Sequence, residues 1–195
     1  MVKKFLSELI WRDFHYHQLY YRPDIAEIDM RDTLANTRWQ SNSVGINSWR
    51  RGKTGIPIID AGMRQLWATG WMHNRVRMLV ASALCKITCK SIGAKGKMVL
   101  GYLSGRGCRE QSGNWQWVAG CGMDAAPYFR VFNPVLQEKI RYKSVYVRKW
   151  VPEIAALPDC WIHKPFAAPR RFLREAGLVL GQTYPLPSSP HQKVC

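Results

Sequence analysis

The segment Gly70–Met78, GWMHNRVRM, gathers side chains that could recognise a nucleic acid. If it is helical, Asn74 and Met78 are four residues apart and Arg75 and Met78 are three apart, so all three can line one surface. An amide, a guanidinium and a thioether suit a base edge, a phosphate and an apolar wall respectively. The alternative is structural, a helix start capped by His73 or Asn74 with Met78 filling the core. For this segment taken alone, the structural alternative is the better explanation.

Two further groups combine aromatic rings with polar or charged neighbours. Glu8, Trp11 and Arg12 have the i, i+3, i+4 spacing that places them on one side of a helix. Trp115 and Trp117 form the third group. Tryptophans are more often core residues than ligand partners, but three such groups in one basic chain indicate a large flat ligand.

The charge balance points to a polyanionic partner. The sequence has 29 Lys and Arg against 13 Asp and Glu, a formal net charge of +16, and such an excess repels itself unless a polyanion offsets it. Nucleic acid is the first candidate. A basic, well-solvated surface explains the charge alone equally well, but the nine tryptophans favour a ligand, because aromatic rings beside arginine stack unpaired bases or hold a planar cofactor.

Length and composition define the class of protein. With 195 residues, 47% hydrophobic and 22% charged, the chain can fold as one globular domain. No run of about 18 apolar residues exists, and the amino terminus lacks the apolar core of a signal peptide. The six cysteines have no zinc-ligand spacing, and we interpret them as reduced thiols. We therefore expect a cytoplasmic protein with no membrane segment and no metal.

Hydrophobic periodicity predicts helices and no strand. The residues between 22 and 56 lack a sustained period, which predicts a long irregular loop. At Asn114–Ala119 the run is too short for periodicity to separate a helical turn from a buried strand, and we favour the helix. Helices are expected at Lys3–Tyr20, Pro57–Thr69 and His73–Ile87. A short helix is expected at Val145–Ala156, where Pro152 restricts its continuation, and one further possible helix lies at Arg170–Ala176. The chain is thus predicted to be all-α with long connecting loops.

Several long strings in this order resemble the helical flavin domain of the photolyase and cryptochrome family. They are FLSELIWRDF, TRWQSN, GKTGIPIIDAGMRQLWATGWMHNRVRM, GNWQWVAGCGMDAAPYFRVFNP and RKWVPEIAALP. The resemblance is greatest to bacterial (class I) cyclobutane pyrimidine dimer photolyases and covers most of Phe5–Pro165, with weaker likeness to Pro187. It implies an all-helical domain that binds FAD and accepts a pyrimidine dimer flipped out of UV-damaged DNA. Light-excited reduced FAD would then split the dimer by electron transfer.

The resemblance assigns lesion-binding roles to residues of all three groups. Glu8 corresponds to the carboxylic acid that hydrogen-bonds the dimer, and Trp11 and Trp117 to the aromatic walls around it. The lesion-facing edge of the pocket is assigned to Asn74, Arg75 and Met78. Asn74 and Met78 also fit the cyclobutane-dimer type, because photolyases for six-four photoproducts have a histidine-rich version of this segment.

The same resemblance assigns residues to the flavin and to its photoreduction. The cofactor-binding positions are Arg12, Trp71, Asn74 and Arg77. Trp39 and Trp115 match the distal and proximal members of the tryptophan chain that carries electrons to the flavin. The basic excess would bind the phosphates that flank the lesion, so DNA binding should weaken as salt rises.

Two segments, 88–111 and 138–144, depart from the family pattern. No tryptophan lies near Ile92, where the family has the middle member of its electron chain, and Gln111 replaces an asparagine that meets the flavin. Suitable synonymous codons can be chosen for most of the first segment and for part of the second. When these codons are read one base later, they encode strings that match the family. We hypothesise compensating frame errors or a decaying gene, which sequencing of the encoding DNA would test.

The interpretation divides the chain into residues 1–166, the carboxyl-terminal part of the flavin and DNA-binding domain, and a proline-rich tail at 167–195. The amino-terminal antenna domain of the family, with its chromophore site, has no counterpart here. The leading hypothesis is a monomeric photolyase acting on UV-damaged DNA, of which this chain is a fragment. The alternatives are a cryptochrome-type blue-light receptor and a cofactor-free basic DNA-binding fragment.

Overall fold

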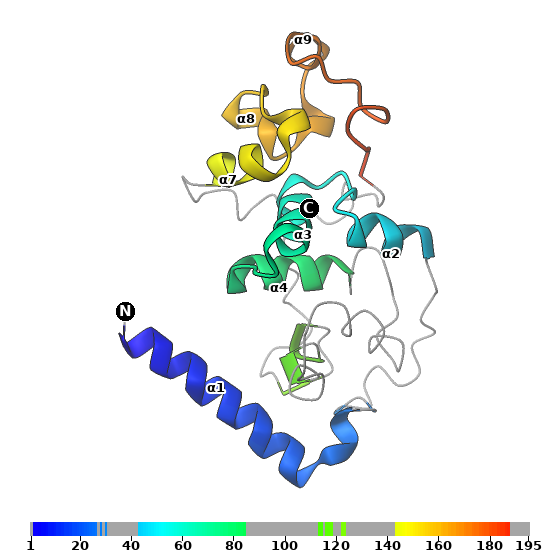
Figure 1. Cartoon of the computed structure of the whole chain (residues 1–195). Coiled ribbons are helices and arrows are strands. Elements are labelled where there is room, and N and C mark those ends of the chain that lie inside the picture. The colour runs from blue at the N-terminus through cyan, green and yellow to red at the C-terminus, as the bar shows by residue number, and fades with distance from the viewer. Residues whose placement is uncertain are drawn as a thin grey trace. The chain divides into compact units, whose positions relative to one another are not determined.

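The computed structural model describes residues 2–26, 28, 30, 43–84, 113–114, 116–118, 122–123 and 143–187. The chain divides into two compact units, of which the first joins Met1–Gln40 to Lys90–Arg130 and the second joins Ser41–Cys89 to Val131–Cys195 (Figure 1). Every regular element in the described residues is helical, and their one β feature is an isolated bridge between Leu180 and Tyr184. The predicted all-α fold is confirmed. No described helix is long and apolar enough to cross a membrane.

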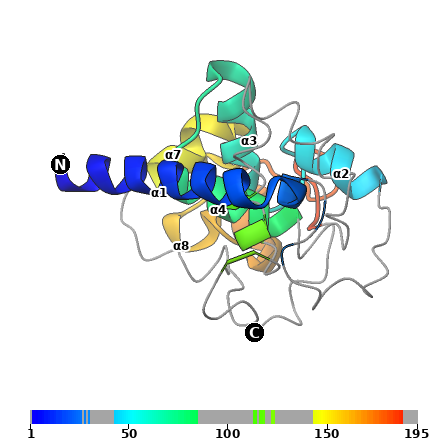
Figure 2. The same cartoon turned by 90° about the horizontal axis from the view of Figure 1, so that it is seen from below.

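The second unit is built around a central helix, α3. The elements of this unit are α2 (Ser43–Arg50), α3 (Pro57–Thr69), α4 (Asn74–Ala83), α7 (Lys143–Trp150), η5 (Pro152–Ile154), α8 (Asp159–Ile162), η6 (Pro165–Ala167) and α9 (Arg170–Glu175). Helix α3 packs against α4, α7 and α2, and α7 and α2 lie on opposite sides of it (Figures 1 and 2). The first seven residues of α3, Pro57 to Met63, are all buried. These contacts form the core of the unit.

Helix α3 begins and ends where its sequence predicts. Pro57 occupies the first turn, where its missing N–H costs no hydrogen bond. Gly70 ends the helix in the left-handed region at φ 69°, and its N–H donates to the carbonyl of Leu66 at 2.8 Å. The predicted bounds of 57 and 69 are confirmed.

Helix α4 follows after a short break. The Nδ1 atom of His73 accepts a hydrogen bond from the backbone N–H of Arg75 at 3.1 Å, so His73 is the N-cap, as one of the two predicted possibilities had it. Leu79 to Ala83 are buried. The predicted extension of this helix to Ile87 falls partly outside the described residues.

Helix α2 corrects the prediction of an irregular loop over residues 22–56. It has only eight residues, includes the poor helix former Gly45, and shows just two buried positions, Gly45 and Trp49. A tertiary contact holds it: the fully buried Trp49 donates from Nε1 to the carbonyl of Val80 at 2.9 Å. Local periodicity could not reveal this helix, because its partner lies 31 residues further along the chain.

The carboxyl-terminal helices contribute a second row of buried apolar residues. Helix α7 ends at Trp150 and Pro152 begins the separate turn η5, so the predicted single helix at 145–156 is wrong beyond residue 150, because the proline stops the helix. Helix α9 matches the predicted helix at 170–176 to within one residue at its end. The residues that are fully buried here are Val147, Val151, Ile154, Leu157 and Ile162.

A buried carboxylate joins the start of α3 to residues near the carboxyl terminus. Asp60 accepts from the Thr54 N–H and hydroxyl, both at 2.7 Å, from the Gly55 N–H at 3.1 Å and from the Tyr184 hydroxyl at 2.6 Å. Asp60 and Tyr184 are both fully buried. Burial raises the pKa of Asp60, and the hydrogen bonds from Tyr184 and Thr54 oppose that increase. The network fixes residue 184, which lies within the predicted tail, against the core of the unit.

The first unit is organised along one long helix. Helix α1 (Val2–Tyr21) confirms the predicted helix at 3–20, and η1 (Pro23–Ala26) follows it. Residues 113, 114 and 116–118 are helical, in agreement with the favoured prediction for that segment. The predicted apolar face of α1 remains largely exposed, with Leu6 at 50% and Ile10 at 68%, and His15 is the one buried residue of the helix.

Candidate functional site

Helix α1 brings Glu8, Trp11 and Arg12 to one side, as their spacing predicts. All three are exposed, and the indole of Trp11 is 56% exposed. The guanidinium of Arg12 binds the neighbouring Asp13 through Nε at 2.9 Å and Nη2 at 2.8 Å. An exposed pair of this kind is weak and leaves Arg12 open to exchange for another acidic partner. This side of α1 presents a carboxylate, a flat apolar ring and a cation to a ligand.

His15 continues the same side by one more turn and supports the ring of Trp11. The two rings have centroids 6.5 Å apart at an interplanar angle of 33°. The Nε2 atom of His15 lies 3.1 Å from Oδ1 of Asn114, and Nδ1 lies 3.2 Å from Oε1 of Gln18. A Cβ atom at Gly113 would clash with the imidazole ring of His15. Glycine at 113 thus allows the turn that carries Asn114 to pack directly on α1.

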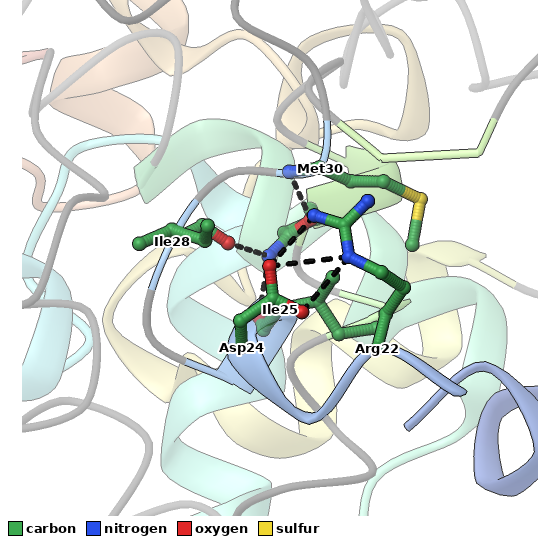
Figure 3. Close-up of polar contacts among 6 residues, drawn as sticks. Arg22, Asp24, Ile25, Ile28 and Met30 are labelled. Atoms are coloured by element: carbon green, nitrogen blue, oxygen red, sulfur yellow. Dashed lines mark hydrogen bonds and ion pairs between the residues drawn. The ribbon is translucent and has the colours of Figure 1, made fainter. Parts of the chain in front are cut away.

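Gln116 binds the segment that follows α1. Its Nε2 donates to the carbonyls of Ile25 at 2.7 Å and Ile28 at 2.9 Å, and its Oε1 accepts from the N–H of Met30 at 3.1 Å (Figure 3). The residue is 6% exposed. Its backbone carbonyl also accepts from the N–H of Gly122 at 3.0 Å. The side chain of Gln116 therefore connects residues 25–30 to the turn that carries Trp117.

An ion pair at the end of α1 orients the same segment. Arg22 donates to Asp24 through Nε at 2.9 and 3.1 Å and through Nη2 at 2.7 Å (Figure 3). The hydrogen bond and charge of Arg22 lower the pKa of Asp24. Trp117 is half-buried in this unit, whereas Trp39 and Trp115 lie outside the described residues.

In the second unit, the start of α4 presents another set of predicted site residues. The indole of Trp71 is 58% exposed and meets the His73 ring edge-on at 6.3 Å. Asn74 and Arg75 are exposed, and Met78 is half-buried. A ligand can therefore reach Asn74 and Arg75. A role of this segment only as a capped helix start does not require that exposure.

Arg77 is a half-buried cation on the same helix. Burial lowers the pKa of its guanidinium, and the side chain makes no hydrogen bond or ion pair with the residues that the structure describes. Removing such a group from water without a partner is costly. An anionic or acceptor-rich ligand at this position would offset that cost, which fits the predicted contact between Arg77 and the flavin.

Comparison with known proteins identifies the family. A family model described as the FAD binding domain of DNA photolyase matches residues 5–194. The chain belongs to this family. The observed helical fold agrees with that membership. No group of three or more His, Cys, Asp or Glu that could hold a metal ion occurs among the described residues.

Individual photolyase relatives match nearly all of this chain. A deoxyribodipyrimidine photo-lyase of Agrobacterium fabrum is 46% identical over 193 residues, which cover 98% of this chain and 40% of that protein. A crystal structure titled as a bacterial class III photolyase from Agrobacterium tumefaciens matches with a TM-score of 0.88 and 45% identity, over 97% of this chain and 40% of the other. A Synechocystis cryptochrome structure matches with a TM-score of 0.84 and 32% identity, over 98% and 40%. The chain spans about 40% of the length of these relatives.

Sequence analysis missed three polar residues of this photolyase-family domain. His15 carried a signal, because it follows Glu8 by seven residues and Trp11 by four and so lies on the same side of α1. Gln116 and Asp60 carried none, because their most distant partners are 91 and 124 residues away.

Proposed function

We propose that this chain forms part of a light-dependent DNA repair enzyme that splits cyclobutane pyrimidine dimers. The observation that carries the proposal is the side of α1 with Glu8 beside the 56% exposed indole of Trp11, in a chain of the photolyase FAD-binding family. The exposed rings of Trp11 and Phe14 meet edge-on at 5.8 Å, and an exposed apolar patch, unlike a single exposed residue, marks a binding surface. The curated photo-lyase relative supports the same activity.

The lesion is proposed to contact Glu8, Trp11 and Trp117. Two linked pyrimidines present apolar ring faces and polar carbonyl and N–H edges. The indole of Trp11 can stack on a ring face, which for a nucleobase contributes about 1–3 kcal/mol. The carboxyl group of Glu8 can hydrogen-bond the polar edge. Flipping is easiest at a damaged base pair, so the protein would favour the lesion over normal DNA.

The flavin is proposed to contact residues at the start of α4, and Arg12 stays a flavin contact assigned by the family resemblance. The half-buried guanidinium of Arg77 and the exposed indole of Trp71 fit an electron-rich ring system with acceptor oxygens. Asn74 is exposed and can hydrogen-bond either the flavin or the lesion, and Arg75 and Met78 are proposed to contact the lesion. When bound, FAD supplies the light-driven electron transfer, and the chain supplies binding, orientation and electrostatics. Trp39 and Trp115 are proposed to carry electrons to it.

The lesion type, the oligomeric state and the cellular location of the protein are further proposals. We infer activity on cyclobutane dimers from the family motif that contains Asn74 and Met78. The predicted class I assignment stays a prediction, since one of the matching structures is titled as class III. A monomer that acts in the cytoplasm on UV-damaged DNA agrees with the net charge of +16, and its affinity for DNA should fall as salt rises.

A cryptochrome-type photoreceptor is the second candidate, because the matching Synechocystis structure is titled as a cryptochrome. Purification of the full-length gene product separates the candidates. The proposal expects a flavin absorption spectrum and loss of dimers from UV-irradiated DNA in blue light but not in the dark. Flavin photoreduction with intact dimers would favour the photoreceptor, and a protein that binds DNA without flavin would favour the cofactor-free fragment.

A further inference from the structure

We propose that Gln116 is a positioning residue for the lesion site, with His15 and Asn114 as a second, weaker anchor. Together they would set the separation between the ring of Trp11 on α1 and the ring of Trp117 on the turn at 113–118. This inference rests on the proposed function, because it assumes that these two rings embrace a pyrimidine dimer. All of these residues belong to the first unit.

Three hydrogen bonds hold the side chain of Gln116 to the segment that follows α1. Both donors and the acceptor of its amide are used on three backbone groups, the carbonyls of Ile25 and Ile28 and the N–H of Met30. At 6% exposure, water cannot easily replace any of them. The three groups follow α1 within nine residues of its last turn. If the turn that carries Gln116 shifts, its hydrogen bonds with this segment must break.

The anchor sets the direction of the neighbouring indole. Successive side chains of a helix point about 100° apart, so a fixed Gln116 also fixes the side on which Trp117 leaves the helical turn. Asn114, one position before Trp115, is held by Nε2 of His15 at 3.1 Å. His15 in turn packs on Trp11. The two anchors therefore connect both proposed walls, through hydrogen bonds of the turn and through the packing of His15 on Trp11.

Apolar packing of α1 contributes little to this separation. His15 is the one buried residue of the 20-residue helix α1, while Phe5 and Ile10 are 65% and 68% exposed. Hydrophobic contacts are non-directional, and here few apolar side chains of α1 are buried. Ile25 after α1 and Val118 on the turn are buried, and hydrogen bonds with fixed lengths and angles add the direction that such packing lacks.

The test uses the full-length gene product with Gln116→Met, which keeps the length of the side chain and removes all its hydrogen bonds. Tyr184→Phe is the matched control, since it removes a buried hydrogen bond in the second unit. Affinities for an oligonucleotide with one thymine dimer and for its undamaged counterpart are measured beside the free energy of unfolding. We expect Gln116→Met to lower the affinity ratio about tenfold, the size of a weakened base stack, with undamaged DNA bound as before. Tyr184→Phe should lose stability with no change in the ratio.

A conservative variant adds a pH-dependent readout. In Gln116→Glu, an ionised carboxylate would face the carbonyl oxygens of Ile25 and Ile28, so the affinity ratio should fall at neutral pH. Protonation restores one donor, and the ratio should recover partly as the pH falls. If Gln116→Met does not fold, Asn114→Ala carries the test, because Asn114 is exposed and its loss should lower the ratio about threefold without unfolding the protein.

The outcomes separate this inference from the proposed function. A folded Gln116→Met or Asn114→Ala variant with the wild-type ratio overturns the positioning role and leaves the proposed function intact. An equal fall of the ratio in Tyr184→Phe also overturns it, because the effect would then be one of general stability. A wild-type protein with no preference for the dimer overturns the proposed function, and the positioning role with it.

Discussion

Trp49 in the second unit is fully buried, and its indole N–H bonds a backbone carbonyl, whereas Trp11 in the first unit is 56% exposed. The same contrast extends to the helices around them. Helix α3 buries seven consecutive residues, while α1 buries only His15. Among the described residues, α3 is thus held by an apolar core, whereas the contacts of α1 include side-chain hydrogen bonds from His15, and Gln116 binds the segment that follows α1.

This difference indicates that the buried rings stabilise the fold and the exposed rings are available to a ligand. A ring that is buried in a core stabilises the fold but cannot meet a ligand, whereas a ring held at the surface keeps its face available. The hydrogen bonds of His15 and Gln116 hold the segments near Trp11 in place while its ring remains exposed. Substitutions in the buried core of the second unit should therefore change stability, and substitutions on the exposed side of α1 should change binding.

The largest loss of stability is expected from Asp60→Ala. The change leaves the Thr54 N–H and hydroxyl, the Gly55 N–H and the Tyr184 hydroxyl without their acceptor inside the core. Buried donors without partners should lower the free energy of unfolding by roughly 3–5 kcal/mol, measured by denaturant titration. Asp159→Ala is the control, because Asp159 is exposed in its pair with Arg148 and its loss should change little. Equal effects of the two substitutions would contradict the contrast between core and surface.

A smaller and pH-dependent effect is expected from Glu153→Gln. Burial raises the pKa of Glu153, but the hydrogen bond and charge of Arg64 outweigh it, so the pKa lies below its ordinary value of 4.5. The ionised pair, at 2.7 Å, therefore stabilises the fold above the unfolded-state pKa and loses this contribution as the pH falls through the folded-state pKa.

For this partly exposed pair we expect a loss of about 0.5–1 kcal/mol at neutral pH. Thermal unfolding of wild type and variant between pH 7 and 3 measures it, with Glu175→Gln as an exposed control. The two curves should converge in acid. A difference that stays constant across this range would exclude the ion pair as its cause.

The sequence predicted those parts of the fold that depend on local chemistry. Pro57 and Gly70 mark the ends of α3 because proline and a left-handed glycine act through their own backbone. Helix α2 was missed because a single buried tryptophan and a distant carbonyl stabilise it. Its eight residues are too few for a periodic signal.

The candidate site divides in the same way. The shared side of Glu8, Trp11 and Arg12 follows from helical spacing and was predicted. Gln116 was not, because its three backbone partners lie between 86 and 91 residues away, and no local pattern brings them together. The sequence thus predicts which side chains share one side of a helix better than it predicts which residues hold them in place.

The most direct test of this account is the pair of values for Trp11→Ala in the full-length gene product: the free energy of unfolding and the affinity for dimer-containing DNA. Because the ring is 56% exposed, the free energy should change by no more than about 0.5 kcal/mol. Loss of base stacking should weaken binding of the dimer by about tenfold or more, while undamaged DNA binds as before. A loss of stability with unchanged dimer affinity would contradict the claim that this side of α1 is exposed in order to bind the lesion.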